Sequence, residues 1–324
     1  MKVLVTGGAG YIGSVAVERL VERGDQVVVL DSLWRGHAAA AASGSEVVKV
    51  DLRDQEAVNA ALLSTRPDAV LHFAAATIVP ESVAQPGEYF AVNTVGSHNL
   101  LEAMRAARVT RFVFSSTAAV YGVPDEIPVR ETTTKAPINP YGLSKWIVEQ
   151  MLPAHREAYG LRSVVFRYFN VAGATAAHGE DHDPETHVIP VALQTLLGKR
   201  PSFSIFGDDY PTGDGTAVRD YVHVLDLVDA HLLALDRIDE DLGVFNLGSR
   251  AGFSVKEIVD AVERATGRSL PTTMAPRRAG DPPVLIADSS RAQTTLGWKP
   301  SRSTLDEMIG SAWDWMRRHP DGYR

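Results

Sequence analysis

The chain contains no cysteine among its 324 residues. This absence excludes disulfide bonds, thiolate nucleophiles and zinc sites built from cysteine. Long hydrophobic runs are also missing, since the apolar stretch "AVLHFAAATIV" at 69–79 is far shorter than the roughly 20 residues that a membrane helix needs. The chain begins with "MKVLVTGG", which indicates a strand and a turn and not a signal peptide. We therefore expect a cytoplasmic protein that does not enter a membrane.

An excess of positive charge is missing as well. The sequence has 32 Lys and Arg against 40 Asp and Glu, a formal net charge of −8. Nucleic-acid binding requires a basic surface, so we expect no nucleic-acid partner. An anionic small ligand is compatible with this charge if a few arginines gather at one place. The length of 324 residues predicts two domains, or one large α/β domain with an added lobe.

The first half of the chain alternates between apolar strand-like runs and amphipathic helical segments. The expected strands lie at 2–6, 26–31, 46–51, 69–73, 111–116 and 162–169, and the expected helices at 11–23, 54–64, 88–107 and 141–159. This alternation is typical of a Rossmann-type, doubly wound parallel sheet. The regularity fades after about residue 170. We expect a dinucleotide-binding domain at 1–170 and a smaller α/β substrate-binding lobe at 171–324, with some segments returning to the first domain.

A glycine-rich loop, "TGGAGYIG" at 6–13, follows the first strand and opens the first helix. Gly7, Gly10 and Gly13 allow a diphosphate to approach the backbone at the helix N-terminus, where free N–H groups favour an anion. The second strand ends in Asp31, at the offset expected for a residue that binds the adenosine ribose. A carboxylate at that place favours NAD over NADP. Arg35 is close enough in sequence to accommodate a 2′-phosphate, so the alternative cofactor stays open.

A hydroxyl, a phenol and an ammonium group are expected to meet at the carboxyl edge of the sheet. Thr117 follows the strand at 111–116, and Tyr141 and Lys145 are one helical turn apart in "NPYGLSKW". Ionising a phenol at neutral pH requires about 4 kcal/mol, because its pKa is near 10. A positive charge at about 4 Å supplies a similar amount at an effective dielectric constant of about 20. Beside a nicotinamide, these three groups form an acid–base site for oxidising an alcohol.

The motifs "TGGAGYIG", "SSTAAVYG" (115–122) and "YGLSK" (141–145) resemble those of the extended short-chain dehydrogenase/reductase family. Within it, the chain is similar over its full length to the nucleotide-sugar 4-epimerases that interconvert UDP-glucose and UDP-galactose. Further stretches carry this resemblance: "HFAAATIVPESV" (72–83), "RYFNVAGA" (167–174), "DDYPTGDGTAVRDYVHVLDL" (208–227) and "APRRAGDPPVLIAD" (275–288). The last two are the most specific.

The resemblance implies roles for individual residues. Tyr141 takes the proton of the sugar 4-hydroxyl, Lys145 holds the nicotinamide ribose and lowers the pKa of the phenol, and Thr117 shares the hydrogen bond of that hydroxyl. A hydride passes from C4 to NAD, the 4-keto sugar turns over, and the hydride returns to its other face. The implied cofactor residues are Gly7, Gly10, Tyr11, Ile12, Gly13, Asp31, Asp51, Leu52, Phe73, Ala74, Asn93, Tyr141, Lys145 and Tyr168.

The UDP-sugar is assigned by the same resemblance to residues of the second half. The implied contacts are Thr117, Asn170, His187, Phe206, Arg219, Arg278, Asp281 and Leu285. Arginines suit this task, because a guanidinium binds a diphosphate with paired hydrogen bonds. Taken alone, however, Arg219 beside Asp220 is typical of a surface ion pair. The resemblance also implies a homodimer, formed through helices near 88–107 and 141–159.

The loop from Glu180 through His182 to His187 has the composition of a metal site. Its candidate ligands lie on one stretch without a recognised spacing, so we expect a loop that covers the substrate and no metal. Two positions differ among relatives. Thr77 stands where some relatives carry a lysine near the cofactor phosphates, which leaves the tightness of NAD binding open. Leu285 is intermediate between a bulky tyrosine and the small residues that admit N-acetylated sugars, so activity on UDP-GlcNAc and UDP-GalNAc also stays open.

Other functions on the same fold are disfavoured. A 4,6-dehydratase or decarboxylase needs acidic side chains after Thr117 to move a proton at C5, but Ala118 and Ala119 occupy these positions. A simple ketoreductase exchanges its cofactor and has no use for arginines that bind UDP. A catalytically inactive NAD-sensing scaffold would be expected to lose Tyr141 or Lys145, and this chain keeps both.

Overall fold

The computed structural model describes residues 1–41, 44–278 and 281–323. They form two compact units, each assembled from segments that are distant in the sequence. Unit 1 consists of Met1–Gly122, Thr134–Arg167 and Val228–Phe245, and unit 2 of Val123–Thr133, Tyr168–Leu227 and Asn246–Arg324.

Unit 1 is built on a seven-stranded sheet with the order β11-β6-β5-β4-β1-β2-β3. The strands are β1 (Lys2–Thr6), β2 (Gln26–Asp31), β3 (Glu46–Lys49), β4 (Ala69–His72), β5 (Arg111–Thr117), β6 (Arg162–Tyr168) and β11 (Gly243–Leu247). β1 pairs in parallel with β2 and β4, β2 with β3, and β4 with β5. The prediction of a doubly wound parallel sheet is therefore confirmed.

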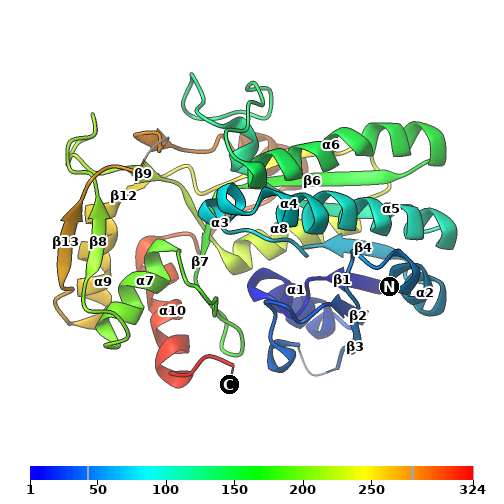
Figure 1. Cartoon of the computed structure of the whole chain (residues 1–324), viewed down its shortest axis with the longest axis horizontal. Coiled ribbons are helices and arrows are strands. Elements are labelled where there is room, and N and C mark those ends of the chain that lie inside the picture. Colours follow the sequence, from blue (N-terminus) through cyan, green and yellow to red (C-terminus); the bar gives the residue numbers. More distant parts are fainter. Residues whose placement is uncertain (42–43, 279–280, 324) are drawn as a thin grey trace. The chain divides into compact units, whose positions relative to one another are not determined.

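Helices cover both faces of this sheet (Figure 1). α1 (Tyr11–Glu22) and α8 (Val224–Asp236) lie on one face, linked by ion pairs from Arg19 and Arg23 of the α1 end to Asp229 and Asp236. α2 (Gln55–Thr65), α5 (Gly96–Ala107) and α6 (Pro140–Tyr159) lie on the other face, where α2 packs on α5.

The helix expected at 88–107 is divided into three successive parts. They are α4 (Pro86–Tyr89), the π-helical turn η2 (Phe90–Val95) and α5, preceded by the short helix α3 (Val79–Ala84). The 3-10 turns η1 (Ala38–Ala40) and η3 (Ala118–Tyr121) complete the unit. A π turn adds one residue to a helical turn and often lies at a functional site.

The hydrophobic core of unit 1 follows from its strand sequences. Buried strands need apolar side chains on both faces, and β2 accordingly reads "QVVVLD" with all but its first residue buried. Leu4, Leu30 and Phe112 of the sheet pack with Leu100 of α5 and Val148 of α6. This core fixes the carboxyl ends of β1, β2, β4 and β5, where the predicted site residues lie.

Unit 2 consists of short strands and four further helical segments. The strand pairs are β7 (Asn170–Ala172) with β10 (Tyr221–His223), β8 (Phe203–Phe206) with β13 (Thr272–Ala275), and β9 (Val218–Arg219) with both β12 (Phe253–Ser254) and β14 (Val284–Leu285). The helices are α7 (Val188–Leu196), α9 (Val255–Thr266), α10 (Leu305–Arg318) and the π-helical turn η4 (Ala292–Leu296). Leu193, Ile258, Met308 and Trp313 form its core. Strands of two to four residues leave little periodicity, which explains the weaker pattern after residue 170.

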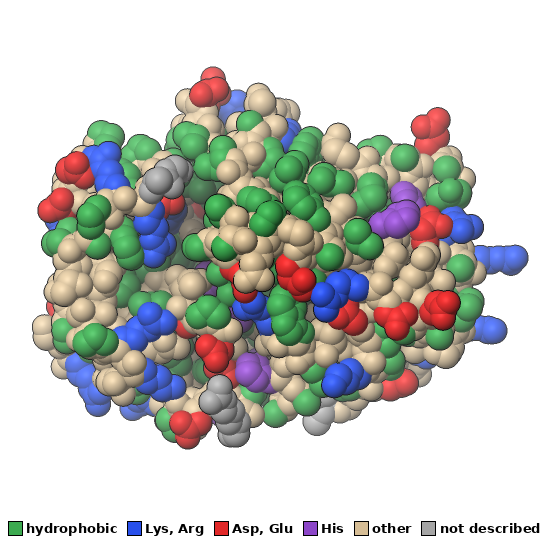
Figure 2. Space-filling view, viewed as in Figure 1, with side chains coloured by type: hydrophobic (Ala, Val, Ile, Leu, Met, Phe, Trp, Pro, Cys, Tyr) green, Lys and Arg blue, Asp and Glu red, His purple; other side chains and the backbone are tan. Residues whose placement is uncertain are grey.

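The surface carries charges of both signs. On the face shown in Figure 2, basic and acidic side chains are interspersed and do not form a broad basic area. Within the described part of the chain, none of the helices has both the length and the apolar character required to cross a bilayer.

Candidate active site

The glycine loop between β1 and α1 leaves no room for side chains. Gly7 has a left-handed φ of 71°, and a Cβ placed on it would lie 2.6 Å from the backbone nitrogen of Ala74. A Cβ on Gly13 would collide with the carbonyl oxygen of Gly7. α1 begins directly after Gly10, and its first N–H groups have no partner within the helix. The loop therefore fits the diphosphate of a dinucleotide, which binds at such a helix end.

Asp31, at the end of β2, is oriented by two backbone N–H groups. Its carboxylate oxygens accept hydrogen bonds from Ala9 N (3.0 Å) and Leu33 N (2.8 Å). Each carboxylate oxygen has a second lone pair, so acceptor capacity remains for ribose hydroxyls. Arg35 is already engaged, because its guanidinium pairs with Glu81 at 2.6 Å and lies over the ring of Trp34. Arg35 is thus directed to Glu81 and not to Asp31, which favours NAD over NADP.

Asp51 and Leu52, predicted near the adenine, follow β3. Asp51 binds the side chain of Arg53 at 2.6 Å, and this hydrogen bond lowers the pKa of the Asp51 carboxyl. Leu52 is buried, and its carbonyl accepts a hydrogen bond from Asn99 Nδ2 (2.9 Å). The structure therefore holds Leu52 firmly, whereas Asp51 stays near the surface with a cationic neighbour.

Asn93 lies on the π-helical turn η2 and is buried. Its amide nitrogen donates to Ala76 O and Ser144 Oγ, both at 2.9 Å, and its amide oxygen accepts from Ala76 N (2.8 Å). It therefore ties the segment after β4 to α6. Phe73 and Ala74 begin that segment, and their N–H groups donate to Thr6 O. These hydrogen bonds position Asn93 beside the segment after β4, and its cofactor role stays a prediction.

The three predicted catalytic residues come together in unit 1. Thr117 ends β5, and α6 begins at Pro140, with Asn139 Oδ1 accepting from Gly142 N (2.8 Å) as the helix cap. Tyr141 is thereby placed in the first turn of α6, where its phenol hydrogen-bonds to Thr117. The hydroxyl oxygen of Thr117 accepts from Ala119 N (3.1 Å), so its proton is available to the phenol oxygen.

Lys145 lies one turn further along α6 and is buried. Its ammonium group donates to the carbonyl of Ser115 (2.9 Å) and lies 4.9 Å from the centre of the Phe114 ring. Burial lowers the pKa of Lys145 to about 7, although the charge of Glu149 opposes this effect. Burial therefore weakens the hold of Lys145 on its proton in the chain alone.

The expected lowering of the phenol pKa is not found in the chain alone. Burial raises the pKa of Tyr141, and the hydrogen bond from Thr117 offsets this only in part. Desolvation disfavours the phenolate because no water stabilises the charge there. The oxidised nicotinamide, which is positively charged, would supply the missing stabilisation when it is bound.

A buried ion pair beside these residues was not anticipated from the sequence. Arg167 at the end of β6 contacts Glu149 of α6 at 2.5 Å, and both side chains are 3% exposed. Glu149 also accepts from Ser116 Oγ (2.5 Å), and Arg167 donates to the hydroxyl of Tyr121 (2.9 Å). These contacts hold the residues on either side of Thr117. The available signal was Glu149 four residues after Lys145, on the same face of the helix.

In unit 2, several residues predicted to bind the UDP-sugar are grouped around β9. The guanidinium of Arg278 lies 4.0 Å from the centre of the Phe206 ring, and Arg219 lies 3.8 Å from Asp281. Leu285 on β14 is the register partner of Arg219 on β9. The segment 275–288 supplies three of these residues, although its positions 279 and 280 lie outside the described residues.

The surface ion pair considered for Arg219 and Asp220 is not formed. Neighbouring residues of a strand point to opposite sides, and Asp220 is fully buried, accepting hydrogen bonds from Ser249, Arg250 N and Ala287 N. Sequence reasoning missed this structural role. Asn170 on β7 donates to the Asp220 carbonyl (2.9 Å), and Tyr168 lies half-buried at the end of β6.

His187 immediately precedes α7 and faces two buried carboxylates. Its Nδ1 lies 2.7 Å from Glu180 Oε1 and 3.1 Å from Glu185 Oε1. Burial by itself lowers the pKa of His187, but the two carboxylates raise it well above its ordinary value. For Glu180 the directions are reversed: burial raises the pKa of its carboxyl, but the neighbouring His187 and His182 lower it to about 2. The role of Glu185 was missed; the spacing E-x-H-x-x-E-x-H from 180 to 187 was its signal.

Comparison with known proteins places the chain among sugar-nucleotide enzymes. Residues 3–248 match the NAD dependent epimerase/dehydratase family. The UDP-glucose 4-epimerase of Streptococcus mutans is 50% identical over 100% of this chain and 99% of its own length. That of Halalkalibacterium halodurans is 49% identical over 100% of this chain and 98% of its own length.

Solved structures agree with this relationship. The UDP-glucose 4-epimerase of Brucella ovis in complex with NAD has a TM-score of 0.93 at 45% identity and covers 96% of this chain and 97% of its own. The Bifidobacterium longum enzyme in complex with NAD+ and UDP has a TM-score of 0.94 at 36% identity, covering 99% and 100%. The UDP-Glc/GlcNAc 4-epimerase of Campylobacter jejuni has a TM-score of 0.87 at 41% identity, covering 98% and 99%. The chain therefore belongs to the NAD dependent epimerase/dehydratase family and, within it, to the family of the UDP-glucose 4-epimerases.

Proposed function

We propose that this protein interconverts UDP-galactose and UDP-glucose by a transient oxidation at C4 of the sugar, with NAD as its cofactor. The observation that carries the proposal is the convergence of buried Thr117 and Lys145 with the partly buried Tyr141 at the carboxyl edge of the sheet in unit 1. We assign NAD to unit 1 and the UDP-sugar chiefly to residues of unit 2. The relatives solved with NAD and with UDP support the choice of these ligands.

The residues of this chain carry out the proton transfer. Tyr141, as phenolate, takes the proton of the 4-hydroxyl, and Thr117 donates a hydrogen bond that keeps the phenol oxygen aimed at this hydroxyl. NAD, when bound, supplies an oxidised nicotinamide that accepts a hydride from C4 and later returns it. Lys145 contributes positive charge beneath this site and is held in place by the carbonyl of Ser115. After the 4-keto sugar turns over, Tyr141 returns its proton to the new hydroxyl.

The diphosphate of the substrate is assigned to the arginines of unit 2. Arg219 and Arg278 carry permanent charge, and Phe206 offers an aromatic face beside Arg278. Asp281 lies 3.8 Å from Arg219 and is assigned to the uridine ribose. We assign Asn170 and His187 to the same half of the substrate, with Nε2 of His187 as the contacting atom because its Nδ1 faces the carboxylates.

Dehydration and plain reduction are less well supported. The residues after Thr117 are Ala118 and Ala119, which offer no group to move a proton at C5. Arg35 is paired with Glu81, which leaves Asp31 facing the cofactor ribose and disfavours the phosphorylated cofactor that many reductases use. Action on N-acetylated UDP-sugars is the second candidate. Leu285 is smaller than tyrosine, and the Campylobacter relative is a UDP-Glc/GlcNAc 4-epimerase.

A coupled assay tests these proposals directly. The purified chain is incubated with UDP-galactose or UDP-GalNAc, with no NAD added, and the epimerised product is measured. We expect turnover of UDP-galactose, because a reaction without net redox change does not consume its cofactor. Turnover only after addition of NAD would show weak retention, to which Thr77 is the relevant position. Complete inactivity with NAD present would contradict the proposed function.

We also propose a homodimer formed through α5 and α6. Val95 and Leu143 are exposed apolar residues, the first just before α5 and the second in the first turn of α6. Sedimentation velocity of the wild type and of Leu143→Glu tests this assignment. A monomeric wild type would contradict it, as would a Leu143→Glu variant that stays fully dimeric.

A further inference from the structure

A cluster of two histidines and two glutamates lies before α7, in unit 2. Glu180, His182, Glu185 and His187 each offer one nitrogen or oxygen atom, and these four atoms all lie within 4.8 Å of one another. Both histidines use Nδ1. Neither the acid–base site nor the assigned nucleotide contacts account for Glu180, His182 and Glu185.

The separations between the imidazole nitrogens and the carboxylate oxygens are close to those around a bound metal ion. A tetrahedral ion with ligands at about 2.0–2.2 Å places those ligands about 3.3–3.6 Å apart. His182 Nδ1 lies 3.1 Å from Glu180 Oε1 and 3.8 Å from Glu185 Oε2. His187 Nδ1 lies 2.7 Å from Glu180 Oε1 and 3.1 Å from Glu185 Oε1. These nitrogen–oxygen distances lie on both sides of the tetrahedral value, with Glu185 offering a different oxygen to each histidine, and the four candidate atoms together span up to 4.8 Å, so binding would draw them closer.

The two carboxylates have acceptor capacity that the protein does not use. The side chains of Glu180 and Glu185 are 5% and 1% exposed. The Oε2 atom of each is buried, and no donor among the described residues forms a hydrogen bond with it. The guanidinium of Arg200 donates to the main-chain carbonyl of Glu185 and not to its carboxylate. Buried carboxylate oxygens without donors are costly, and an ion is one of the explanations they call for.

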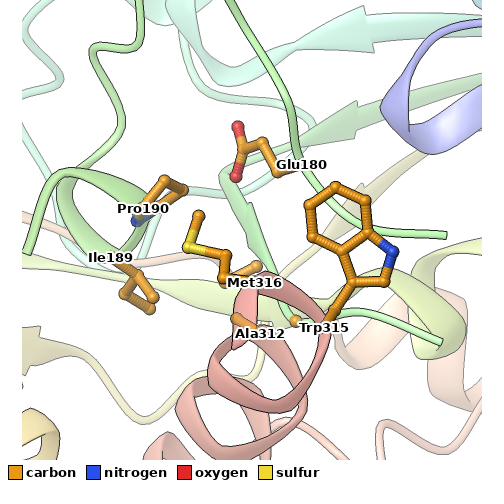
Figure 3. Close-up of a pocket in the computed structure, with 8 residues that line it drawn as sticks. Glu180, Ile189, Pro190, Ala312, Trp315 and Met316 are labelled. Atoms are coloured by element: carbon orange, nitrogen blue, oxygen red, sulfur yellow. The ribbon is translucent and has the colours of Figure 1, made fainter. Parts of the chain in front are cut away.

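The surrounding contacts hold the cluster in shape. Glu185 Oε1 accepts hydrogen bonds from the backbone N–H groups of Thr186 (2.7 Å) and His187 (2.8 Å). Gly179, next to Glu180, exchanges hydrogen bonds with the hydroxyl of Tyr323. Glu180 also borders a small apolar pocket, and Figure 3 shows its side chain beside the ring of Trp315, above the helix α10. An apolar wall limits water and strengthens electrostatic binding of an ion.

We propose that Glu180, His182, Glu185 and His187 bind one divalent transition-metal ion, zinc by the chemistry of the donor set, which fixes the loop 180–187 to the start of α7. Imidazole nitrogen together with carboxylate oxygen suits zinc, whereas an all-oxygen set would suit magnesium or calcium. Two carboxylates with two neutral imidazoles balance the charge of a divalent ion. The competing arrangement is a metal-free cluster in which both imidazoles are protonated. The proposal departs from our expectation that this loop holds no metal.

Metal content and metal titration decide between the two arrangements. Full-length protein is purified without a histidine tag, and its metals are measured by inductively coupled plasma mass spectrometry. We expect about one equivalent of zinc, or of another divalent transition metal, per chain. After removal of metal with a chelator, added Zn²⁺ should rebind with a stoichiometry of one and raise the melting temperature. Added Co²⁺ should give the visible absorption of a four-coordinate site. Protein that contains no metal and gains neither stability with Zn²⁺ nor a Co²⁺ spectrum would overturn the proposal.

Substitutions assign the ligands. We expect His182→Ala and Glu185→Gln each to weaken Zn²⁺ binding by at least tenfold. Asp183→Asn is the matched control, because Asp183 lies in the same loop and is exposed; His98→Ala, an exposed imidazole on α5, controls for the loss of a histidine. Equal Zn²⁺ affinity in the ligand variants and the controls would refute the assignment. If a ligand variant does not fold, the wild-type titration alone decides. None of these measurements requires sugar or NAD, so they are independent of the proposed catalytic function.

Discussion

The two units hold their functional side chains in different ways. In unit 1, Thr117 and Lys145 are buried, and each forms a hydrogen bond with a backbone group, Thr117 with Ala119 N in the turn after β5 and Lys145 with Ser115 O on β5. In unit 2, Arg278 and Asp281 are exposed and lie on a loop between strands of two to four residues. Proton transfer depends on sub-ångström geometry, whereas charged contacts to a diphosphate tolerate adjustment. The difference teaches that the chemistry is fixed by the sheet, while substrate choice is left to segments that can vary.

The largest effect is expected in unit 1, for the substitution Tyr141→Phe. Loss of the phenol removes the group that moves the proton, so we expect kcat to fall by about 10³-fold or more, roughly 4 kcal/mol in activation free energy. Affinity for UDP should change little, because the assigned UDP contacts lie in unit 2. Turnover from the coupled assay and UDP binding by calorimetry give the two values. Tyr159→Phe, at an exposed position on the same helix, is the control. Wild-type turnover in Tyr141→Phe would refute the assignment of the base.

Removing the buried ion pair should be the next largest effect. Glu149→Ala leaves the Arg167 charge buried without its partner, and we expect unfolding to become easier by about 3 kcal/mol. Arg156 lies on the same helix as Glu149 and forms an exposed ion pair with Asp241. Its replacement by alanine should lower the free energy of unfolding by less than about 1 kcal/mol. Urea unfolding of the three proteins measures both. Similar losses in the two variants would show that burial does not distinguish these pairs.

Lys145 should make stability depend on pH. Its pKa is about 7 in the folded chain against an ordinary value of 10.5, so the unfolded chain binds more protons between these limits. The free energy of unfolding therefore rises with pH across this window, by about 2 kcal/mol between pH 7 and pH 9. Lys145→Met lacks this contribution. Urea unfolding of both proteins without nucleotide, at pH 7, 8 and 9, should show the difference between them changing with pH. Parallel curves would indicate an unperturbed lysine.

The smallest effect is expected in unit 2, at the residue assigned to substrate selection. Leu285→Tyr adds bulk next to Arg219, and we expect activity on UDP-GalNAc to fall by about tenfold while UDP-galactose is spared. Val284→Leu, the neighbouring residue of β14 on its opposite side, is the control for added volume in this strand. The ratio of kcat/KM values for the two sugars is the measurement. Equal losses on both sugars would show that Leu285 does not select between them.

The sequence determined the framework of unit 1 closely. β1, β2 and α6 begin and end within about one residue of the predicted limits, because hydrophobic periodicity, glycine and the Asn139–Pro140 start signal act locally. The convergence of Thr117 with Tyr141 also followed, since parallel strands end at one edge of a sheet. The π turn in 90–95 was not predicted, because a helical pattern does not reveal one extra residue in a turn.

Long-range partners were the main omission. Glu149 and Arg167 are separated by a helix end and a strand, and Asp220 binds backbone groups from two distant segments. Periodicity carries no information about such pairs. The cluster at 180–187 is different, because its members are close in sequence and only their convergence was missed. A loop without regular structure gives no rule for the directions of its side chains, so composition alone could not reveal it.

The position of Asp31 also bears on attempts to re-engineer coenzyme preference. Exchanging this acid for a small neutral residue is an obvious route to acceptance of a phosphorylated coenzyme. Here the same carboxylate secures the N–H groups of Ala9, within the glycine loop, and of Leu33. Alanine at this position would therefore loosen the diphosphate cradle while removing the charge, whereas asparagine retains one oxygen acceptor. A useful redesign would combine two substitutions. Replacing Glu81 would release Arg35 to face a phosphate, and replacing Asp31 by asparagine would keep an acceptor for the glycine loop.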